Sequence, residues 1–338
     1  MSELTQDVEK SPNELSCPIC DSSQASEYLN YGEFAICNCE NCKVLFTWPL
    51  PSDEYLTKFY QGFMYSDGQA GFMPSPKELE QQLQVRIGEI KKLFDVDEQS
   101  AKGKRFLDFG GGTGAAFGAA RKIGFDAYFF DVDENAISYV EKSFNTSSES
   151  MIRDLNAVQQ DFDYILCDNV IEHVQEPLGL IKLLHSRLAP GGKLIFKTPM
   201  AKNTEMYFCP LVSVAYAKRA IKHNGVLGGL KAYFRPYWHC EPPRHLFGFS
   251  DKSLVQAAVR TGISEENISI CHYRIGYWSN TFAQRLFRMI KYGAGKKSWM
   301  VPLAAIALIP EFFIKLLQLP LTLLNLLSPS GVILVLKK

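Results

Sequence analysis

The stretch RFLDFGGGTGAAFGAA, residues 105–120, places an acid inside an apolar run and follows it with a cluster of glycines. The aromatic and aliphatic residues around Asp108 indicate a short buried strand, and the alanine-rich stretch after the glycines indicates a helix. Because glycine has no Cβ, a strand, a glycine turn and a helix N-terminus in succession bring backbone N–H groups close to a bound ligand. We therefore expect a ligand-binding turn directly after Asp108.

Two motifs fit these glycines. The dinucleotide-binding fingerprint G-x-G-x-x-G/A uses Gly110, Gly112 and Ala115. The pattern D-x-G-x-G-x-G instead uses Asp108, Gly110, Gly112 and Gly114. A glycine turn alone does not choose between them, and a tight turn without a ligand has the same letters, so the rest of the chain has to decide.

Composition narrows the class of protein. The 338 residues are enough for more than one domain, and a hydrophobic content of 46% fits a globular enzyme. Lys plus Arg equals Asp plus Glu, at 36 each, so the chain lacks the overall positive field that attracts nucleic acid. The polar and acidic start MSELTQDVEKSPNEL predicts no signal peptide, and we therefore expect a cytoplasmic chain whose nine cysteines stay reduced.

Five of the nine cysteines lie in two short motifs near the N-terminus. CPIC supplies Cys17 and Cys20, and CNCENC supplies Cys37, Cys39 and Cys42. With Cys39 and Cys42 as the second pair, the spacing is C-x2-C-x18-C-x2-C, which is typical of a zinc ribbon. Such a site is closed and structural, because four thiolates complete a tetrahedron around one ion. Cys37 is the surplus thiol and suits a strand. Reduced cysteines without metal are the alternative.

Strands and helices alternate through the centre of the chain. Residues 75–94 have helical spacing, and AYFFDVDENAISYV predicts a strand ending at Asp131 and a helix capped by Asp133. A further strand is predicted over 164–167, then a helix, a Pro-Gly-Gly turn and another strand, and GVILVLKK predicts a final strand. This alternation predicts an open, mainly parallel sheet with ligands at the carboxyl ends of its strands.

The acid at the end of the second strand carries further information. Asp131 lies about twenty residues past the glycines, where an acid at a strand end can hydrogen-bond both hydroxyls of a ribose. In this order and spacing, DFGGGTG, Asp131, CDNVIEHV and LAPGGKLIFKTP resemble the class I S-adenosylmethionine-dependent methyltransferases. The resemblance covers roughly residues 76–275 and the last eight residues. It disfavours a dehydrogenase, because PGGKLIFKTP followed by a closing antiparallel strand is not expected in that fold.

The resemblance implies an α/β fold with a doubly wound, mainly parallel, seven-stranded Rossmann-like sheet, a small N-terminal zinc ribbon and a helical apolar insert before the last strand. The ribbon followed by VLFTWPLP and FYQGFMY also resembles one branch of the family, which includes sugar C-methyltransferases and enzymes of polysaccharide or secondary-metabolite pathways. The expected divisions are a zinc ribbon at 1–50, a linker and N-terminal helices at 51–100, a cofactor-binding domain at 101–276 with an acceptor lid at 200–243, the apolar insert at 277–330 and the final strand at 331–338.

The resemblance also implies a cofactor-binding set. In this family the acid of the first strand contacts the methionyl amino end of S-adenosylmethionine, and the glycines let the ribose approach the backbone. An acid after the second strand binds the ribose, a residue after the third reads the adenine amino group, and the chain after the fourth passes the methyl group. The matching residues, in that order, are Asp108, then Gly110, Gly112 and Gly114, then Asp131, Asp154 and Asn169.

Candidate catalytic groups come from three places in the chain. Methyl transfer is an in-line displacement, so the enzyme has to align the acceptor and remove its proton. Glu172 and His173 leave the fourth strand at the reactive end, and His173 is the leading base because imidazole titrates near neutral pH. Structural support of the loop is the alternative for this pair. His245, on a proline-rich loop, resembles a substrate-side residue. Tyr60 and Tyr65 either pack or project phenols into the site.

The acceptor is expected to be a small molecule, namely a sugar, glycan or lipid-linked glycan precursor. One alternative is a ribosomal RNA methyltransferase that grips RNA with its ribbon, but no Lys or Arg lies between Cys17 and Cys42. Another is a non-catalytic cofactor-binding scaffold, which the intact motif set disfavours. The oligomeric state is left open by the sequence.

The apolar tail suggests a further partner. Prolines break residues 299–328 into pieces too short for a single membrane crossing, and a basic amphipathic stretch precedes them. This combination favours peripheral membrane contact through 282–328. A helical insert packed on the protein or on a second copy is the equal alternative.

Overall fold

The computed structural model describes residues 15–60, 74–146, 148–155, 158, 161–201, 210–234, 240–273 and 329–338, without the side chains at 57, 60, 210–216 and 234. Tyr65, the side chain of Tyr60 and nearly all of the predicted apolar insert at 277–330 lie outside these residues, as does the predicted membrane contact through 282–328. Within the described ranges, no helix has both the length and the apolar character needed to cross a membrane.

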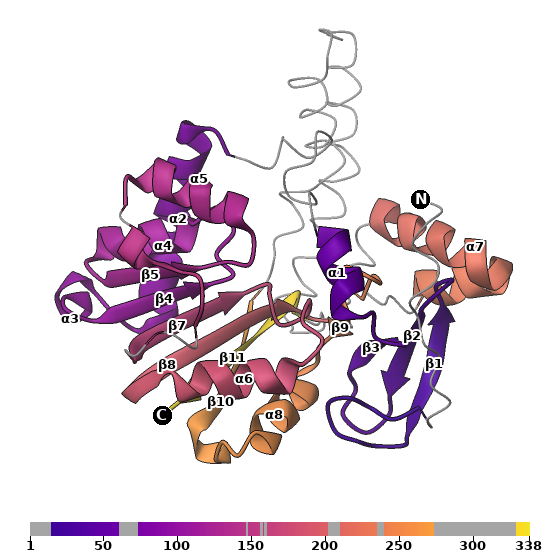
Figure 1. The fold of residues 1–338 in the computed structure, drawn as a ribbon. Coiled ribbons are helices and arrows are strands. Elements are labelled where there is room, and N and C mark those ends of the chain that lie inside the picture. The colour runs from indigo at the N-terminus through magenta and orange to yellow at the C-terminus, as the bar shows by residue number, and fades with distance from the viewer. Residues whose placement is uncertain are drawn as a thin grey trace, which may run out of the picture.

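A seven-stranded sheet forms the centre of the molecule, in the order β10-β11-β8-β7-β4-β5-β6 (Figure 1). Strands β4 to β8 pair in parallel, whereas β11 is antiparallel to both of its neighbours, β8 and β10. The strands are β4 (Arg105–Phe109), β5 (Asp126–Phe130), β6 (Met151–Ile152), β7 (Phe162–Asp168), β8 (Leu188–Pro199), β10 (Ile268–Tyr273) and β11 (Gly331–Lys337). The predicted parallel sheet with a closing antiparallel strand is confirmed.

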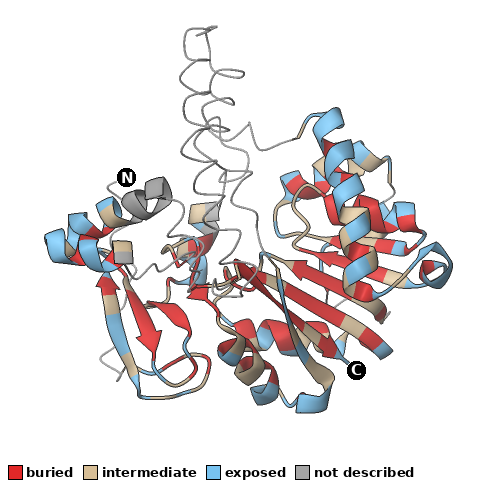
Figure 2. Cartoon of the chain, turned by 180° about the vertical axis from the view of Figure 1, so that it is seen from behind, coloured by how far each residue is buried: buried red, intermediate tan, exposed pale blue. Residues whose placement is uncertain are grey.

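Alternate residues of the strands form two separate cores, one on each face. Phe106, Leu166 and Ile195 pack beneath α2 (Pro76–Phe94), α4 (Ala115–Ile123) and α5 (Glu134–Phe144). Leu107 and Ile165, one position away, pack beneath α6 (Pro177–Ser186) and α8 (Asp251–Arg260). Period-two alternation of apolar side chains therefore gives a sheet that is buried on both faces, as the red strands of Figure 2 show.

The helix starts follow from their capping residues. Helix α2 begins with a capping box, in which the Ser75 side chain accepts from the Glu78 N–H while the Glu78 side chain bonds back to Ser75. Asp133 caps α5 by accepting from the Asn135 N–H, as the sequence predicts. The short helix α3 (Glu98–Ala101) leads into β4.

Two of the strands are irregular, and the first of them differs from the sequence prediction. The Pro-Gly-Gly stretch does not precede β8 but lies within it as an irregularity, because the pairing with β7 steps from Leu188 to Lys193 while β7 advances only from Phe162 to Tyr164. Strand β6 is only two residues long and follows a 3-10 turn at Ser148–Ser150. Both segments are polar or glycine-rich, so they lack the side chains that favour regular pairing.

A second, antiparallel sheet lies beside the first, in the order β1-β2-β3-β9 (Figure 1). Three of its strands come from the cysteine-rich segment, β1 (Ala25–Asn30), β2 (Ala35–Cys39) and β3 (Leu45–Trp48). The fourth, β9 (Phe247–Gly248), comes from the loop before α8 and pairs with β3. The cysteine-rich sheet is therefore completed by a strand of the central domain. Helix α1 (Asp53–Tyr60) follows β3.

The described part of the predicted acceptor lid contacts this second sheet. Helix α7 (Pro210–Phe234) is bent at Gly225, whose φ and ψ are 65° and −171°. The Asn224 side chain exchanges two hydrogen bonds with the backbone of Asn30 in β1, and Lys231 donates to the Tyr28 carbonyl. The lid helix is thus anchored on the cysteine-rich sheet.

Candidate active site

The glycine turn follows β4 at the carboxyl edge of the sheet. Gly110, Gly112 and Gly114 all have left-handed backbones, with φ of 69°, 54° and 70°. A Cβ added to Gly111 would come within 2.5 Å of an Asp108 carboxylate oxygen, so the acid lies directly beneath the turn. A Cβ at Gly112 would meet no heavy atom within 4 Å. The turn therefore presents its backbone to open space at Gly112, as a ribose-binding loop requires.

Asp108 fastens the turn to the helix that follows. Its side chain is only 3% exposed, and one oxygen accepts a 2.8 Å hydrogen bond from the N–H of Phe117 in the first turn of α4. Burial raises the pKa of Asp108 to about 7, and the hydrogen bond from the Phe117 N–H partly opposes this increase. Its contact with the methionyl end of the cofactor stays a prediction.

Asp131 lies one residue beyond β5 and joins two strand ends. One of its oxygens accepts from the Gly112 N–H at 2.9 Å, and the other accepts from the Asp133 N–H at 3.0 Å. Burial raises its pKa, and the two N–H donors oppose that change. The structure therefore brings Asp131 and the glycine turn into contact, as expected of groups that share one ribose.

The two remaining cofactor candidates follow β6 and β7. Asp154 is exposed two residues after β6, and Asn169 is exposed one residue after β7 with a left-handed φ of 57°. The Asn169 N–H donates to the Lys197 carbonyl at 2.8 Å. Because β4 to β7 are parallel, both residues share the edge that carries the glycine turn.

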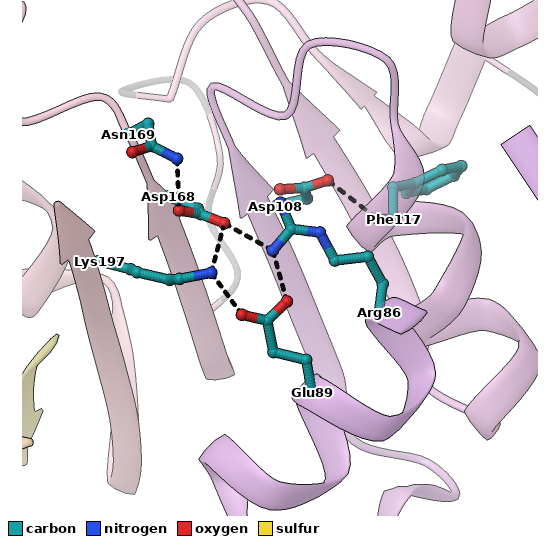
Figure 3. Close-up of polar contacts among 7 residues, drawn as sticks. All are labelled: Arg86, Glu89, Asp108, Phe117, Asp168, Asn169 and Lys197. Carbon is teal, nitrogen blue, oxygen red and sulfur yellow. Dashed lines mark hydrogen bonds and ion pairs between the residues drawn. The ribbon is translucent and has the colours of Figure 1, made fainter. Parts of the chain in front are cut away.

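A network of four charged residues at this edge was missed by the sequence reasoning (Figure 3). Arg86 of α2 donates at 2.6 Å to both Asp168, the last residue of β7, and Glu89. Lys197 of β8 bonds to Glu89 and lies 3.5 Å from the same Asp168 oxygen. Asn169 donates to the other Asp168 oxygen at 2.8 Å. Helical spacing puts Arg86 and Glu89 on one face, but nothing in the sequence pairs that face with β7 and β8.

The network is electrically balanced. Burial disfavours the charged form of Arg86, but Asp168 and Glu89 outweigh it and raise the pKa of the guanidinium. Burial likewise opposes the charge of Glu89, but Arg86 and Lys197 lower its pKa. Two cations and two carboxylates therefore fix α2 against the ends of β7 and β8, next to Asn169.

The predicted catalytic pair leaves β7 and is held by two other elements. Glu172 is 1% exposed, and one of its oxygens accepts from the Thr198 hydroxyl at 3.0 Å. Its other oxygen is buried and has no hydrogen-bond partner among the described residues. Burial raises the pKa of Glu172 to about 8, so the carboxyl is mostly protonated at pH 7.

His173 lies against the proline-rich loop. Its Nδ1 is 2.8 Å from the Arg244 carbonyl, which can only accept, so Nδ1 carries the proton and Nε2 carries the lone pair. Burial of the ring lowers the pKa of His173 to about 4 and keeps it neutral at pH 7. The ring therefore binds a proton less tightly than the near-neutral titration expected from the sequence implies. The ring centroids of His173 and the buried His245 are 4.6 Å apart. Of the predicted catalytic residues, the structure thus brings Glu172, His173 and His245 together.

The four thiols selected by their spacing converge. The Sγ atoms of Cys17, Cys20, Cys39 and Cys42 all lie within 4.8 Å of one another, with the pairs Cys17–Cys42 and Cys20–Cys39 at 3.6 Å. A tetrahedral ZnS4 centre has Zn–S bonds of about 2.3 Å, so its sulfur atoms are separated by roughly 3.8 Å. The cluster therefore fits zinc in its donor set and its size.

Cys37 stands apart from this cluster. It lies on β2, is 1% exposed, and belongs to none of the metal-ligating groups found among the described residues. Burial raises the pKa of its thiol to about 12, with Glu27 adding to the effect. This cysteine is a protonated packing residue.

Comparison with known proteins identifies relatives of the central domain. A family model described as a methyltransferase domain matches residues 77–264. A ubiquinone biosynthesis O-methyltransferase of Coxiella burnetii is 29% identical over 136 residues, which are 38% of this chain and 58% of that protein. The enzyme of the same name from Pseudomonas putida is 25% identical over 167 residues, 45% of this chain and 71% of that protein. The chain thus spans little more than half of the Coxiella relative.

Solved structures resemble the chain more distantly. The phosphoethanolamine N-methyltransferase 2 of Haemonchus contortus in complex with S-adenosyl-L-methionine is 14% identical and has a TM-score of 0.48. That match covers 87% of this chain and 61% of the other. A SAM-dependent methyltransferase from Archaeoglobus fulgidus is 15% identical with a TM-score of 0.43, covering 76% of this chain and 94% of the other.

Proposed function

We propose that this chain, which belongs to the methyltransferase domain family, is an S-adenosylmethionine-dependent methyltransferase that acts on a small-molecule acceptor, namely a sugar, glycan or lipid-linked glycan precursor. The observation that carries the proposal is the pairing of a ribose-type glycine turn with a buried Glu172, His173 and His245 cluster after β7. The balanced charge and the ribbon without Lys or Arg from 17 to 42 disfavour a polyanionic acceptor such as RNA.

The residues that would hold the cofactor lie along the carboxyl edge of the sheet. Gly112 would leave room for the ribose, Asp131 would bind its hydroxyls, and Asp154 would read the adenine amino group. When bound, S-adenosylmethionine supplies an electrophilic methyl group on a sulfonium. Asn169, fixed by Asp168, borders the position expected for that group.

His173 is the proposed base. Its Nδ1–H is committed to the Arg244 carbonyl, so a proton leaving the acceptor would be taken up at Nε2. The hydrogen bond from Nδ1 to the Arg244 carbonyl also fixes the plane of the ring, so Nε2 is aligned before the methyl acceptor binds. Glu172, the residue before His173, is buried and mostly protonated at pH 7, so it adds little charge to this part of the chain. His245 would then position the acceptor.

We further propose that Cys17, Cys20, Cys39 and Cys42 hold one structural zinc ion. All four ligand positions are taken by thiolates, so the ion would close the ribbon and take no part in methyl transfer.

A second candidate acceptor is a hydroxyl group of a ubiquinone precursor. The names of the Coxiella and Pseudomonas relatives favour it, although their similarity covers less than half of this chain.

The test is a screen with methyl-labelled cofactor against nucleotide-sugars, lipid-linked glycans, ubiquinone precursors and bulk RNA. We expect label in a sugar or glycan, and much less of it with the Asp131→Ala variant at the same cofactor concentration. Label in the ubiquinone precursor alone would select the second candidate, and label in RNA would overturn both. Tight cofactor binding without transfer to any acceptor would favour a scaffold.

A further inference from the structure

The two C-x2-C turns of the ribbon are attached to opposite ends of one helix. At the start of α8, the Ser250 hydroxyl donates to the carbonyl of Cys42 at 2.9 Å. At its end, Arg260 donates to the carbonyl of Ile19 at 2.7 Å, and its guanidinium also pairs with Asp21. Ile19 lies within the first cysteine pair and Cys42 closes the second. Each half of the thiol cluster is therefore bonded to a different end of α8.

The segment before α8 is held between the ribbon and the catalytic loop. The Thr47 N–H of β3 donates to the Leu246 carbonyl at 2.8 Å. On the other side, the N–H groups of Leu246 and Phe247 donate to the Glu172 carbonyl at 2.8 and 3.1 Å. His245 immediately precedes these two residues. Its backbone is thus fixed by neighbours that bridge the ribbon and the loop after β7.

Packing joins the same elements. Buried side chains of the thiol cluster, β3, β9 and α8 belong to a single hydrophobic core that continues into the main sheet, and they include Cys39, Phe46, Phe247, Leu254 and Ala257. The glycine turn is attached elsewhere, since its N–H groups bond to the Phe130 carbonyl and to Asp131. A structural change in the ribbon would therefore reach His245 through direct contacts, whereas the glycine turn is separated from the ribbon by further elements.

We infer that the ribbon is a positioning device for the acceptor side, in which Ser250 and Arg260 transmit the geometry of the closed thiol cluster through α8 and β9 to His245. When the thiol cluster is closed, the carbonyls of Ile19 and Cys42 have fixed positions, and their hydrogen bonds to Arg260 and Ser250 fix the two ends of α8. The position of α8 sets the segment that places His245 against His173. The inference rests on the proposed zinc ion and on the proposed acceptor-side role of the histidines.

The test compares Arg260→Ala, Arg260→Lys and Arg121→Ala in the full chain. Arg121 is the matched control, because it also lies in the last turn of a helix and donates to a single carbonyl, that of Phe144. Three quantities are measured for each variant: amide hydrogen exchange, the ring resonances of His173 and His245, and the affinity for S-adenosylmethionine.

We expect Arg260→Ala to speed exchange of the Leu246 and Phe247 amides by tenfold or more and to shift the His245 resonance. Cofactor affinity should stay within twofold of the parent chain. Arg260→Lys should restore much of the protection, because one donor still reaches the Ile19 carbonyl. Arg121→Ala should leave the 246–247 amides unchanged. Unchanged protection in Arg260→Ala, or equal acceleration across the glycine turn, would overturn the inference.

A second measurement covers the case in which Arg260→Ala does not fold. Stepwise chelation of the parent chain should deprotect residues 240–250 before the amides of the glycine turn, and a simultaneous loss would overturn the inference. Neither readout needs turnover, so failure of the proposed acceptor class and failure of this inference are separable.

Discussion

The cofactor side and the acceptor side of the candidate active site are built from contacts of very different range. On the cofactor side, Asp108 bonds to a residue nine positions away, and Gly112 bonds to Asp131 nineteen positions away. On the acceptor side, His173 bonds to a carbonyl 71 positions away, and the ribbon is tied to α8 by bonds that span 208 and 241 positions. A strand-turn-helix unit and its neighbour can assemble the ribose end of the first side, whereas Asn169 depends on the distant contact between Arg86 and Asp168. The second needs three distant segments to dock together.

The two sides also differ in charge. Asp108 and Asp131 are buried acids that accept backbone N–H groups, so their charged forms have partners. Glu172 accepts from one neutral hydroxyl, and both it and His173 are uncharged at pH 7 according to pKa values of about 8 and about 4. A positively charged cofactor would therefore stabilise the ionised carboxylates of the cofactor side, whereas the acceptor side offers a neutral environment for proton transfer.

The largest expected effect separates the ribbon from the rest of the molecule. Cys39→Ser should reduce the metal content from one zinc per chain to almost none, because it removes one ligand of a closed site. Structural zinc binds zinc-finger peptides with an apparent free energy of about 10–16 kcal/mol at pH 7, so the ribbon should lose its fold together with the β9 segment that pairs with it. Cys37→Ser is the control and should keep the metal. Elemental analysis of purified chains checks both, and the reverse result would mean that the ribbon uses the other register.

The next effect separates chemistry from binding. His173→Ala should lower turnover by about a hundredfold or more, the usual scale for loss of a general base, with little change in cofactor affinity. His185→Ala is the matched control, because that histidine also bonds a carbonyl through one ring nitrogen, on the distant α6. Single-turnover kinetics and calorimetry check the pair. Near-normal turnover in His173→Ala would return the residue to structural support and point to His245 as the base.

A smaller effect concerns the cofactor side. Asp131→Ala should weaken S-adenosylmethionine binding by about tenfold to a hundredfold, since hydrogen bonds to a charged group contribute about 1.5–3 kcal/mol. Asp133→Ala removes a helix cap two residues away and should cost about 1 kcal/mol of stability while leaving affinity unchanged. Calorimetry and thermal unfolding of both variants measure the contrast. Equal affinity losses would show that Asp131 acts through the turn and not on the ribose.

The range of the contacts also explains what the sequence predicts. The glycine turn, Asp131 and the cap at Asp133 depend on neighbours within one βαβ unit, and their predicted places agree with the structure. The four-thiol cluster follows from spacing alone, because two short turns and one ion dictate its geometry.

The missed features depend on docking between distant elements. Arg86 contacts Asp168 only because α2 packs against the ends of β7 and β8, and no local sequence pattern predicts that packing. The pairing of β9 with β3 is equally invisible, since a two-residue strand has no periodicity to detect. Helix faces and strand ends can be read from the sequence, whereas their partners follow from the assembled fold.

The smallest effect tests the neutral character of the acceptor side through pH. The pKa of Glu172 is raised from its ordinary 4.5 to about 8, so the folded chain binds this proton more tightly than the unfolded chain does. The stabilisation is fully present below pH 4.5 and is lost as the pH rises towards 8. Glu172→Gln cannot titrate, and its melting temperature relative to the parent chain should therefore rise between pH 5 and pH 8. A difference of about 2–4 °C per kcal/mol is the scale to expect for chains of somewhat smaller size.

The comparison between the two chains isolates Glu172 from other titrating groups. Asp108 also has a raised pKa, of about 7, and loses stability in the same direction, but it is present in both chains. His173 has a lowered pKa, so its contribution grows as the pH rises from about 4 to its ordinary 6.5, again in both chains. The exposed Glu265→Gln is the control and should show no such trend. A melting-temperature difference that stays flat from pH 5 to pH 8 would mean that Glu172 is ionised when folded, and the acceptor side would then carry a buried negative charge on the residue that precedes the proposed base.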